Sequence, residues 1–293
     1  MFAYCADPST LTGWWWFSCY LTSATHIDFY QSFGVVLLLL ALAAPSALAL
    51  GMAGAMAARA RFWPLALVGR GYVNMVRGIP DIIFFLFVPI ALDQAIEVIF
   101  HYSLCPGWTE DIWQGNDFRV CDQARTPAPG APVWVRQTYG FILALIAFAL
   151  VFGAFVANTL KGAMDAVPHA QVETAEAYGM TRAQAFRRVV LPQMWIYALP
   201  GLSNLWMILT KATPLLFLLG IQDIVYWARE LGGQKTGHFT YPHPDWRLWY
   251  FLVVLAFYLT MTWGSQKFFD RLMLRVNRGQ ATAGGEAQRR AAA

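Results

Sequence analysis

Five stretches of this chain contain few or no charged residues, and each is long enough to cross a lipid bilayer as a helix, which takes about 20 residues. They run from Phe29 to Ala58, from Ile82 to Phe100, from Gln137 to Leu160, from about Met194 to Ile221, and from Leu248 to Gln266. Only 13% of the 293 residues are charged, compared with roughly 25% in a soluble domain. The sequence therefore predicts an all-α membrane protein with five transmembrane helices.

The basic residues indicate the orientation, because Lys and Arg in short loops stay on the cytoplasmic side of a membrane. With the amino terminus outside, the inside segments contain 14 Lys and Arg residues and the outside segments contain six. We therefore expect a periplasmic amino terminus and a cytoplasmic carboxyl terminus. The formal net charge of +4 follows from this bias, and a basic patch interleaved with aromatic residues, typical of nucleic-acid binding, is absent from the sequence.

The expected segments follow from this topology. Residues 1–28 form a periplasmic or interfacial segment, because Trp14 to Phe17 are aromatic and such residues collect where membrane meets water. No Lys or Arg precedes Arg59, which argues against a secretory signal; a partly buried extra helix is the alternative. Residues 29–276 form the transmembrane domain, with a periplasmic loop at 101–136 and a cytoplasmic loop at 161–192, and residues 277–293 form a cytoplasmic tail.

The polar segment between the third and fourth spans, which we call the 161–192 loop, contains local signals for a first short helix. Pro168 suits the first position of a helix, and the following residues up to Tyr178 are good helix formers. Gly179 is the residue type favoured just past a helix end. We predict a helix over 169–178.

A second short helix follows in the same loop. Thr181 stands three residues before Gln184, the spacing of a capping box. Ala185, Phe186 and Val189 then lie along one side and three arginines lie off it, namely Arg182, Arg187 and Arg188. We expect this helix to stop near Pro192, so that two short helices at a glycine hinge form a compact knob that another protein could hold.

Several motifs of the chain occur in the order found in a known family. In the 161–192 loop the motif residues are Glu173, Thr174, Ala175, Gly179, Val189, Leu191 and Pro192. Outside it they are Arg77 to Asp81, Gly153 to Gly162, and Gly201 to Asp223. Together they resemble the EAA loop, the Arg-Gly-x-Pro element and the fourth span of permeases in binding-protein-dependent ABC importers, most closely the polar amino-acid branch that includes histidine/lysine/arginine/ornithine and opine permeases.

The resemblance implies a type I ABC importer permease fold and a mechanism. The knob would be the coupling helix that docks on a cytoplasmic ATPase, with Glu173 as its anchor and with Ala175 and Gly179 allowing close approach. The implied partners are a second permease, a paralogue rather than a second copy, a dimer of ATPases, and a periplasmic substrate-binding protein. Thr174 departs from the family pattern, which has Ala there. The chain lacks a phosphate-binding Gly-Lys-Ser/Thr loop, so ATP and Mg are expected on the partner ATPase.

Polar residues inside spans are costly, and they mark function or structural pairing. The candidates for a substrate pathway are Asn158, Asn204, Lys211, Asp93, Glu97 and Asp81. Asp93 and Glu97 are four apart and share a helix face, so they either attract a cationic substrate or pair with neighbours. Lys211 either holds a substrate carboxylate or pairs with a neighbouring helix. Asn158 stands at a position where permeases of this branch often have Glu. This subunit therefore has no carboxylate at that position to recognise a cationic side chain of the substrate.

The four cysteines all fall in segments expected outside the membrane on one face, at Cys5, Cys19, Cys105 and Cys121. The periplasm is oxidising, so disulfides are expected there. Local pairs, Cys5 with Cys19 and Cys105 with Cys121, are slightly favoured because each closes a short loop. A cross pairing and four free thiols are the alternatives.

Catalytic chemistry is not visible in the sequence. The histidines, at positions 26, 101, 169, 238 and 243, lack metal-ligand spacing and are expected in loops or on the surface. Ser and Cys residues lack a nucleophile motif. The sequence therefore favours a non-enzymatic permease subunit in the bacterial inner membrane that imports a polar or basic amino acid or an opine-like derivative. A permease for another small solute, a membrane enzyme and a channel are the alternatives.

Overall fold

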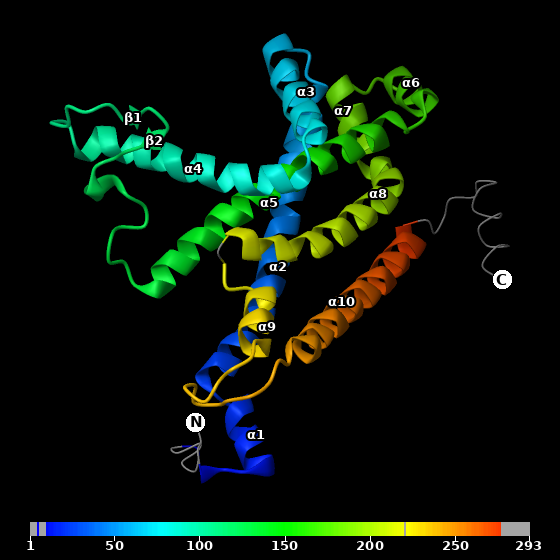
Figure 1. The fold of residues 1–293 in the computed structure, drawn as a ribbon. Coiled ribbons are helices and arrows are strands. Elements are labelled where there is room, and N and C mark those ends of the chain that lie inside the picture. Colours follow the sequence, from blue (N-terminus) through cyan, green and yellow to red (C-terminus); the bar gives the residue numbers. More distant parts are fainter. Residues whose placement is uncertain (1–4, 6–9, 220, 277–293) are drawn as a thin grey trace. The chain divides into compact units, whose positions relative to one another are not determined.

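The computed structural model describes Cys5, residues 10–219 and residues 221–276, without the side chains at 75–77, 81, 218 and 219. It is mostly helical (Figure 1). The α-helices are α1 (Gly13–Leu21), α2 (Ala24–Ala58), α3 (Trp63–Gly78), α4 (Asp81–Leu104), α5 (Val133–Asp165), α6 (His169–Ala177), α7 (Arg182–Ala185), α8 (Leu191–Ala212), α9 (Ile224–Gly232) and α10 (Arg247–Val276). Shorter elements are the strands β1 (Trp113–Gln114) and β2 (Asp117–Phe118) and the turns η3 (Asp122–Ala124), η4 (Phe186–Val190) and η5 (Thr213–Leu219). The expected tail at 277–293 lies outside the described residues.

Four helices in the described part of the chain are long and apolar enough to cross a membrane, namely Ala24–Ala58, Ile82–Leu104, Val133–Asp165 and Arg247–Val276. They coincide with four of the five predicted spans. The remaining span, predicted from Met194 to Ile221, falls on α8 and η5 and does not join these four. Lys211 and several polar residues lower its hydropathy, and the α-helix gives way to a 3-10 turn at Thr213.

The predicted connection between the first two spans contains a helix that the sequence analysis did not predict. α3 contains Arg70 and Arg77, two of the basic residues counted for the inside segments. Its buried residues Ala66 and Val73 are seven positions apart and so lie on one side of the helix. Gly69 allows close approach to α2, because a Cβ atom there would lie 2.5 Å from the backbone nitrogen of Ala58.

The chain divides into two compact units. The first comprises residues 1–45, 78–151 and 212–257, and the second comprises residues 46–77, 152–211 and 258–293.

In the first unit, α1 is a helix with one buried face and one exposed aromatic face. Cys19 and Tyr20 are buried, and the ring of Trp16 stacks on that of Tyr20 with 5.2 Å between centroids. Trp14 and Trp15 are exposed, at 75% and 58% of their surface. The amino-terminal segment therefore has both an aromatic outer face and a packed inner face.

In the second unit, small residues bring α2 and α5 close together. A Cβ atom at Gly51 would lie 2.3 Å from Val156, and one at Gly153 would lie 3.0 Å from Leu50. The core that these helices share with α8 is apolar and contains, among others, Leu160, Met164, Met194 and Ala198. This packing holds the ends of α5 and α8 from which the 161–192 loop extends.

Candidate functional site

The first short helix of the 161–192 loop forms as its local signals predict. α6 begins after Pro168 and ends where Gly179 adopts φ +83°, a left-handed conformation that glycine adopts easily. The amide of Gly179 donates to the carbonyl of Glu176 at 2.9 Å, and that of Met180 donates to the carbonyl of Ala175 at 3.1 Å. These two bonds are those of a Schellman motif, so the hinge is a fixed turn.

The second short helix begins with the predicted capping box. The amide of Thr181 donates to the side chain of Gln184 at 2.9 Å, and the amide of Gln184 donates to Thr181 Oγ1 at 3.4 Å. The expectation that this helix stops near Pro192 is wrong. After α7, the π-helical turn η4 leads directly into α8, and Pro192 is the second residue of α8. A proline in the first turn of a helix is tolerated, and a π-turn accommodates the missing donor.

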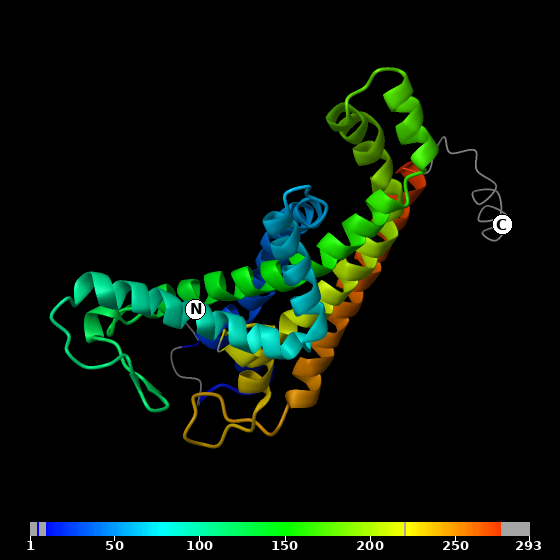
Figure 2. The ribbon, with the colours of Figure 1, turned by 90° about the horizontal axis from the view of Figure 1, so that it is seen from above.

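Figure 2 shows the 161–192 loop beyond the end of α5, where α6 and α7 lead into α8. Glu173 is exposed, and Tyr178 beside the hinge is 84% exposed. The hydroxyl of Thr174 donates to the carbonyl of Ala170 at 2.7 Å, so its polar group is satisfied within the helix. Ala175 is only 5% exposed, and α6 packs against α7 and η4, so this small side chain serves packing inside the knob.

The remaining motif residues of the loop have mixed exposure: Gly179 and Pro192 are exposed, and Leu191 is partly buried against the apolar core of the second unit. The three arginines after the hinge are exposed, and Val190 is buried. The loop is therefore a packed body that presents Glu173 and Tyr178 outward.

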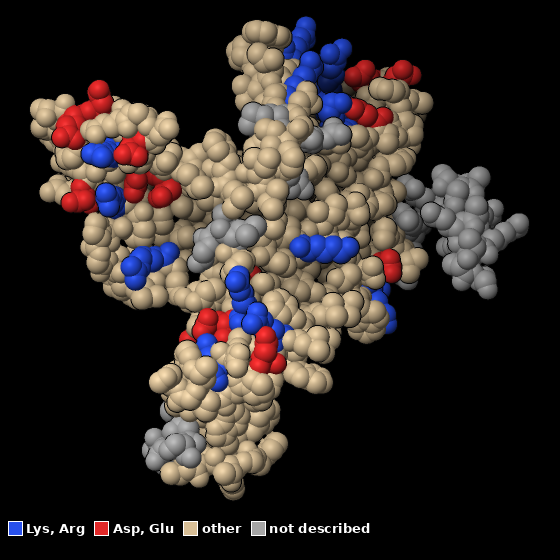
Figure 3. Space-filling view, viewed as in Figure 1, with Lys and Arg blue, Asp and Glu red and all other residues tan. Residues whose placement is uncertain are grey.

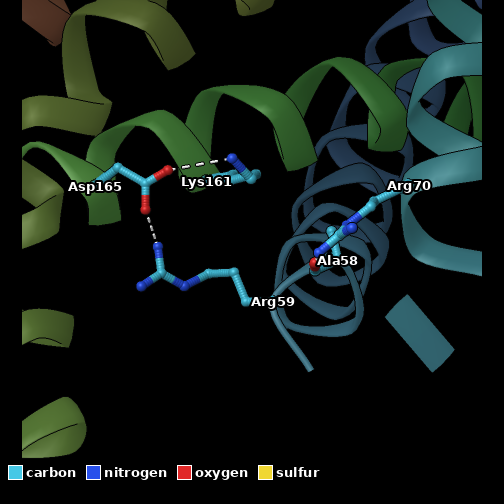
Figure 4. A network of polar contacts seen from close by, with 5 residues as sticks. All are labelled: Ala58, Arg59, Arg70, Lys161 and Asp165. Atoms are coloured by element: carbon cyan, nitrogen blue, oxygen red, sulfur yellow. Dashed lines mark hydrogen bonds and ion pairs between the residues drawn. The ribbon is translucent and has the colours of Figure 1, made fainter. Parts of the chain in front are cut away.

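Charged side chains gather in the second unit where α2 turns into α3 (Figure 3). Arg59 and Arg61 lie in the turn after α2, and Arg70 lies in the middle of α3. Arg59 Nη1 pairs with Asp165 Oδ1 at the end of α5, and Lys161 Nζ lies 3.2 Å from Asp165 Oδ2 (Figure 4). The pair of Arg59 and Asp165 has no local signal in the sequence, because the two residues lie 106 positions apart.

The polar residues predicted for a substrate pathway on α5 and α8 are exposed in the single chain. Asn158 is exposed on α5, and Asn204 and Lys211 are exposed on α8. Asn204 and Lys211 are seven residues apart and so share one helix face. The two helices touch nearby, since a Cβ atom at Gly201 would lie 2.6 Å from the side chain of Thr159. Exposed polar groups on apolar helices avoid lipid. Asn158, Asn204 and Lys211 therefore require a polar or protein environment.

Asp93 and Glu97 bond to the segment that follows the β-hairpin. The hydroxyls of Thr126 and Tyr139 donate to Asp93 Oδ1 at 2.9 Å and 2.7 Å. The amide of Thr126 donates to Glu97 Oε1 at 3.0 Å. Of the two interpretations left open for this pair, these contacts support pairing with neighbours. The side chains of Arg77 and Asp81 lie outside the described residues.

The cysteines form the two local pairs. Cys5 is bonded to Cys19 with 5.5 Å between their Cα atoms, and Cys105 is bonded to Cys121 with 6.7 Å between theirs. The second bond encloses a small core in the loop after α4, where Val120 and Ala124 are buried.

Three of the histidines are buried: His26 and His101 lie in helices, contrary to the expected surface or loop positions, whereas His243 lies in the loop between α9 and α10. His101 Nδ1 accepts a hydrogen bond from the amide of Cys121 at 3.1 Å. The other two, His26 and His243, belong to a chain of hydrogen bonds described next. His238 and His169 are exposed. Among the described residues, no group of three or more His, Cys, Asp or Glu side chains is placed to hold a metal ion.

In the first unit, a series of hydrogen bonds through Tyr250 and Tyr20 connects His26 to His243. Tyr250 donates to the hydroxyl of Tyr20 at 3.0 Å, so His26 Nε2, 2.6 Å away, donates to Tyr250. His26 Nδ1 then accepts from Ser23 at 3.0 Å. His243 Nδ1 donates to the carbonyl of Pro244 at 2.7 Å, and its Nε2 lies 3.1 Å from the hydroxyl of Tyr20, which also donates to the carbonyl of Leu231 at 3.4 Å. These hydrogen bonds join α1, α2 and α10.

Asp223 carries a buried carboxylate. In the sequence it stands out only as the last residue of the Gly201 to Asp223 motif. Its Oδ1 accepts from the amide of Tyr226 at 2.9 Å and caps α9. Its Oδ2 is buried without a hydrogen-bond partner among the described residues. Burial raises the pKa of Asp223 from 3.8 to about 6, because a desolvated carboxylate is easier to protonate.

Comparison with known proteins identifies the class to which this fold and this loop belong. Residues 50–275 match the family described as "Binding-protein-dependent transport system inner membrane component". The chain belongs to this family.

Two relatives have named transport systems. The chain is 31% identical over 231 residues to the arginine ABC transporter permease protein ArtQ of Escherichia coli K12, covering 79% of this chain and 87% of that protein. It is also 31% identical over 217 residues to the histidine/lysine/arginine/ornithine transport system permease protein HisQ of Salmonella typhimurium LT2, covering 74% of this chain and 78% of that protein.

Solved structures show the same fold. A crystal structure of an amino acid ABC transporter with histidines matches 91% of this chain and 100% of its own, with a TM-score of 0.60 at 20% identity. An inward-facing structure of the MetNI methionine ABC transporter matches 86% of this chain and 95% of its own, with a TM-score of 0.52 at 13% identity. At these identities the likeness concerns the fold alone.

Proposed function

We propose that this chain is one of two membrane subunits through which an ATP-driven importer moves a polar or basic amino acid, or an opine-like derivative, from periplasm to cytoplasm. The chain is a permease component of an ABC transporter, and ATP hydrolysis belongs to a separate subunit. The names of the relatives support an amino acid as the transported solute. A fifth span formed by α8 and η5, a periplasmic amino terminus and location in a bacterial inner membrane complete the proposal.

The observation that carries this proposal is the construction of the 161–192 loop. A Schellman turn and a capping box fix its backbone, and Ala175 and Ala185 are buried inside it. Glu173 and Tyr178 remain exposed on α6. A rigid helix that presents a carboxylate and an aromatic ring suits docking in a groove of an ATPase, where the carboxylate pairs with an Arg of the partner. ATP and Mg bind to that partner.

The exposed polar face of α5 and α8 supports the second part of the proposal. Asn158, Asn204 and Lys211 cannot face lipid without cost, so we place them against a second permease, a paralogue rather than a second copy. A pathway between two such subunits would let Lys211 meet the carboxylate that all amino acids carry. The binding protein delivers the solute from the periplasmic side.

Co-purification tests this function directly. The tagged chain is expressed with its own chromosomal neighbours, and the accompanying chains are identified by mass spectrometry. The purified binding protein is then offered labelled arginine, histidine, lysine, ornithine and octopine. We expect an ATPase and a second permease in the complex, and retention of at least one of these compounds. A chain that purifies without an ATPase, although it is inserted and folded, would contradict the proposal.

A further inference from the structure

The carboxylate of Asp165 holds one cation on each oxygen at the base of the 161–192 loop (Figure 4). Lys161 approaches Oδ2 from the preceding turn of the same helix. Arg59 reaches Oδ1 from the turn after α2. The two ion pairs therefore differ in what they connect: the Lys161 pair lies within α5, whereas the Arg59 pair joins separate elements.

On the Arg59 side, the pair is attached to a rigid corner. The amide of Arg59 donates to the carbonyl of Met56 at 3.2 Å and closes the last turn of α2. Arg70 Nε of α3 donates to the carbonyl of Ala58 at 3.3 Å (Figure 4). Gly69 lets the backbones of α3 and α2 meet closely beside Ala58. Because these contacts fix α3 to the end of α2, a force on Arg59 acts on the whole α2–α3 corner.

On the Asp165 side, the pair is attached to the base of the loop. Asp165 is the last residue of α5, three residues before the cap of α6. Val167 is buried in the core of the second unit, and Val172 and Phe186 of the loop pack against that core. The loop is thus fixed to α5, so a displacement of α6 displaces Asp165.

We propose that Arg59 and Asp165 form a strut by which the α2–α3 corner follows the 161–192 loop when the partner ATPase moves it. This inference rests on the proposed function. Arg59 and Asp165 are positioning residues here. They touch neither solute nor nucleotide, and they act by keeping α2 and α3 in register with the moving end of α5.

Replacement of either partner tests the strut in the reconstituted complex with its ATPase, second permease and binding protein. Hydrolysis is stimulated with the binding protein loaded with whichever of arginine, histidine, lysine, ornithine or octopine the wild-type complex takes up. We expect Arg59→Ala and Asp165→Asn to lower stimulated hydrolysis and uptake roughly twofold to fivefold, the range that a partly exposed ion pair supports, with unchanged basal hydrolysis.

Lys161→Ala is the matched control, because it removes the other ion pair of the same carboxylate. We expect stimulated hydrolysis close to that of the wild type. The charge-reversed double variant Arg59→Asp with Asp165→Arg should recover most of the lost stimulation. Normal stimulation in both single variants, or equal losses in Lys161→Ala, would overturn the strut.

A cross-linking experiment distinguishes a role of the pair in movement of the corner from a role in stability alone. Arg59→Cys and Asp165→Cys are joined by a short bifunctional thiol reagent in the assembled complex. If the corner follows the loop, the cross-linked complex retains stimulated hydrolysis, and cross-linking is equally efficient without nucleotide and after vanadate trapping. Loss of stimulation upon cross-linking would show that the two elements move apart, and would overturn the strut. Wild-type complex that lacks any stimulated hydrolysis would instead contradict the proposed function.

Discussion

Nε2 of His26, near the start of α2, lies 2.6 Å from the hydroxyl of Tyr250 in α10, although 224 positions separate the two residues. The hydroxyl of Tyr250 donates to that of Tyr20 at 3.0 Å, and the Tyr20 hydroxyl lies 3.1 Å from His243 Nε2. Together these contacts hold α1 and α2 against α10 within the first unit.

Tyr250→Phe tests how much this series of hydrogen bonds contributes to the stability of the fold. The change leaves a buried His26 N–H without an acceptor and removes a donor from Tyr20, so we expect the free energy of unfolding to fall by about 1–3 kcal/mol. Thermal unfolding of the purified protein in detergent, followed by intrinsic fluorescence, measures the change. Tyr102→Phe is the control, because Tyr102 is 71% exposed. Equal melting temperatures for the two variants would contradict a stabilising role.

The disulfide pairing is tested by mass spectrometry of alkylated, unreduced protein. We expect two linked peptides, one joining Cys5 to Cys19 and one joining Cys105 to Cys121, as in the structure. Removal of the second bond by a paired Cys→Ser change should cost about 3 kcal/mol, the loss for a loop of roughly 15 residues. Four alkylated cysteines, or peptides that link the amino-terminal segment to the loop after α4, would refute the pairing.

The raised pKa of Asp223 predicts how the stability of the folded chain depends on pH. Its pKa is about 6 in the folded protein and 3.8 as the ordinary value, so between these pH values the folded chain binds more protons than the unfolded chain. The contribution of Asp223 to stability is therefore largest below pH 4, falls as the pH rises through 6, and reaches a loss of about 3 kcal/mol above it.

Asp223→Asn removes this titration and retains a residue that caps helices well. We expect the variant to be more stable than the wild type at pH 8 and to show a smaller fall in melting temperature between pH 4 and pH 7. Asp111→Asn, which changes an exposed carboxyl group, is the matched control. Parallel pH profiles for wild type and Asp223→Asn would contradict the assignment.

The polar face of α5 and α8 is tested by uptake kinetics. Asn158→Ala and Lys211→Met should each weaken the apparent affinity of the reconstituted transporter for its amino acid while expression changes little, because both side chains are exposed on the single chain. Lys235→Met, in the segment after α9, is the control for loss of one positive charge. If uptake kinetics remain untouched in both variants, Asn158 and Lys211 do not line the pathway.

Local chemistry explains which parts of this fold could be predicted from the sequence. The long apolar windows located four of the helices, and Gly179 and the Thr181 to Gln184 spacing located the turns of the 161–192 loop. These signals act over a few residues, and the structure contains each of them. Family resemblance added the coupling role proposed for Glu173, which no local pattern predicts.

Contacts between distant residues could not be predicted in this way. α3 was not predicted because glycines and arginines interrupt its apolar residues, and the end of the second short helix was misplaced because a π-turn admits Pro192 into α8. The partners of His26 and of Asp165 lie more than 100 positions away. Periodicity and spacing contain no information on such pairs.

The proposed coupling of this chain to an ATPase through Glu173 on α6 is tested most directly by Glu173→Ala in the reconstituted complex. The measurement is ATP hydrolysis stimulated by loaded binding protein, with Glu110→Ala as a control that removes a carboxylate from the loop expected on the opposite side of the membrane. We predict that Glu173→Ala inserts normally but loses ATPase association and stimulated hydrolysis, whereas Glu110→Ala retains both. Normal stimulated hydrolysis in Glu173→Ala would contradict a coupling role for Glu173.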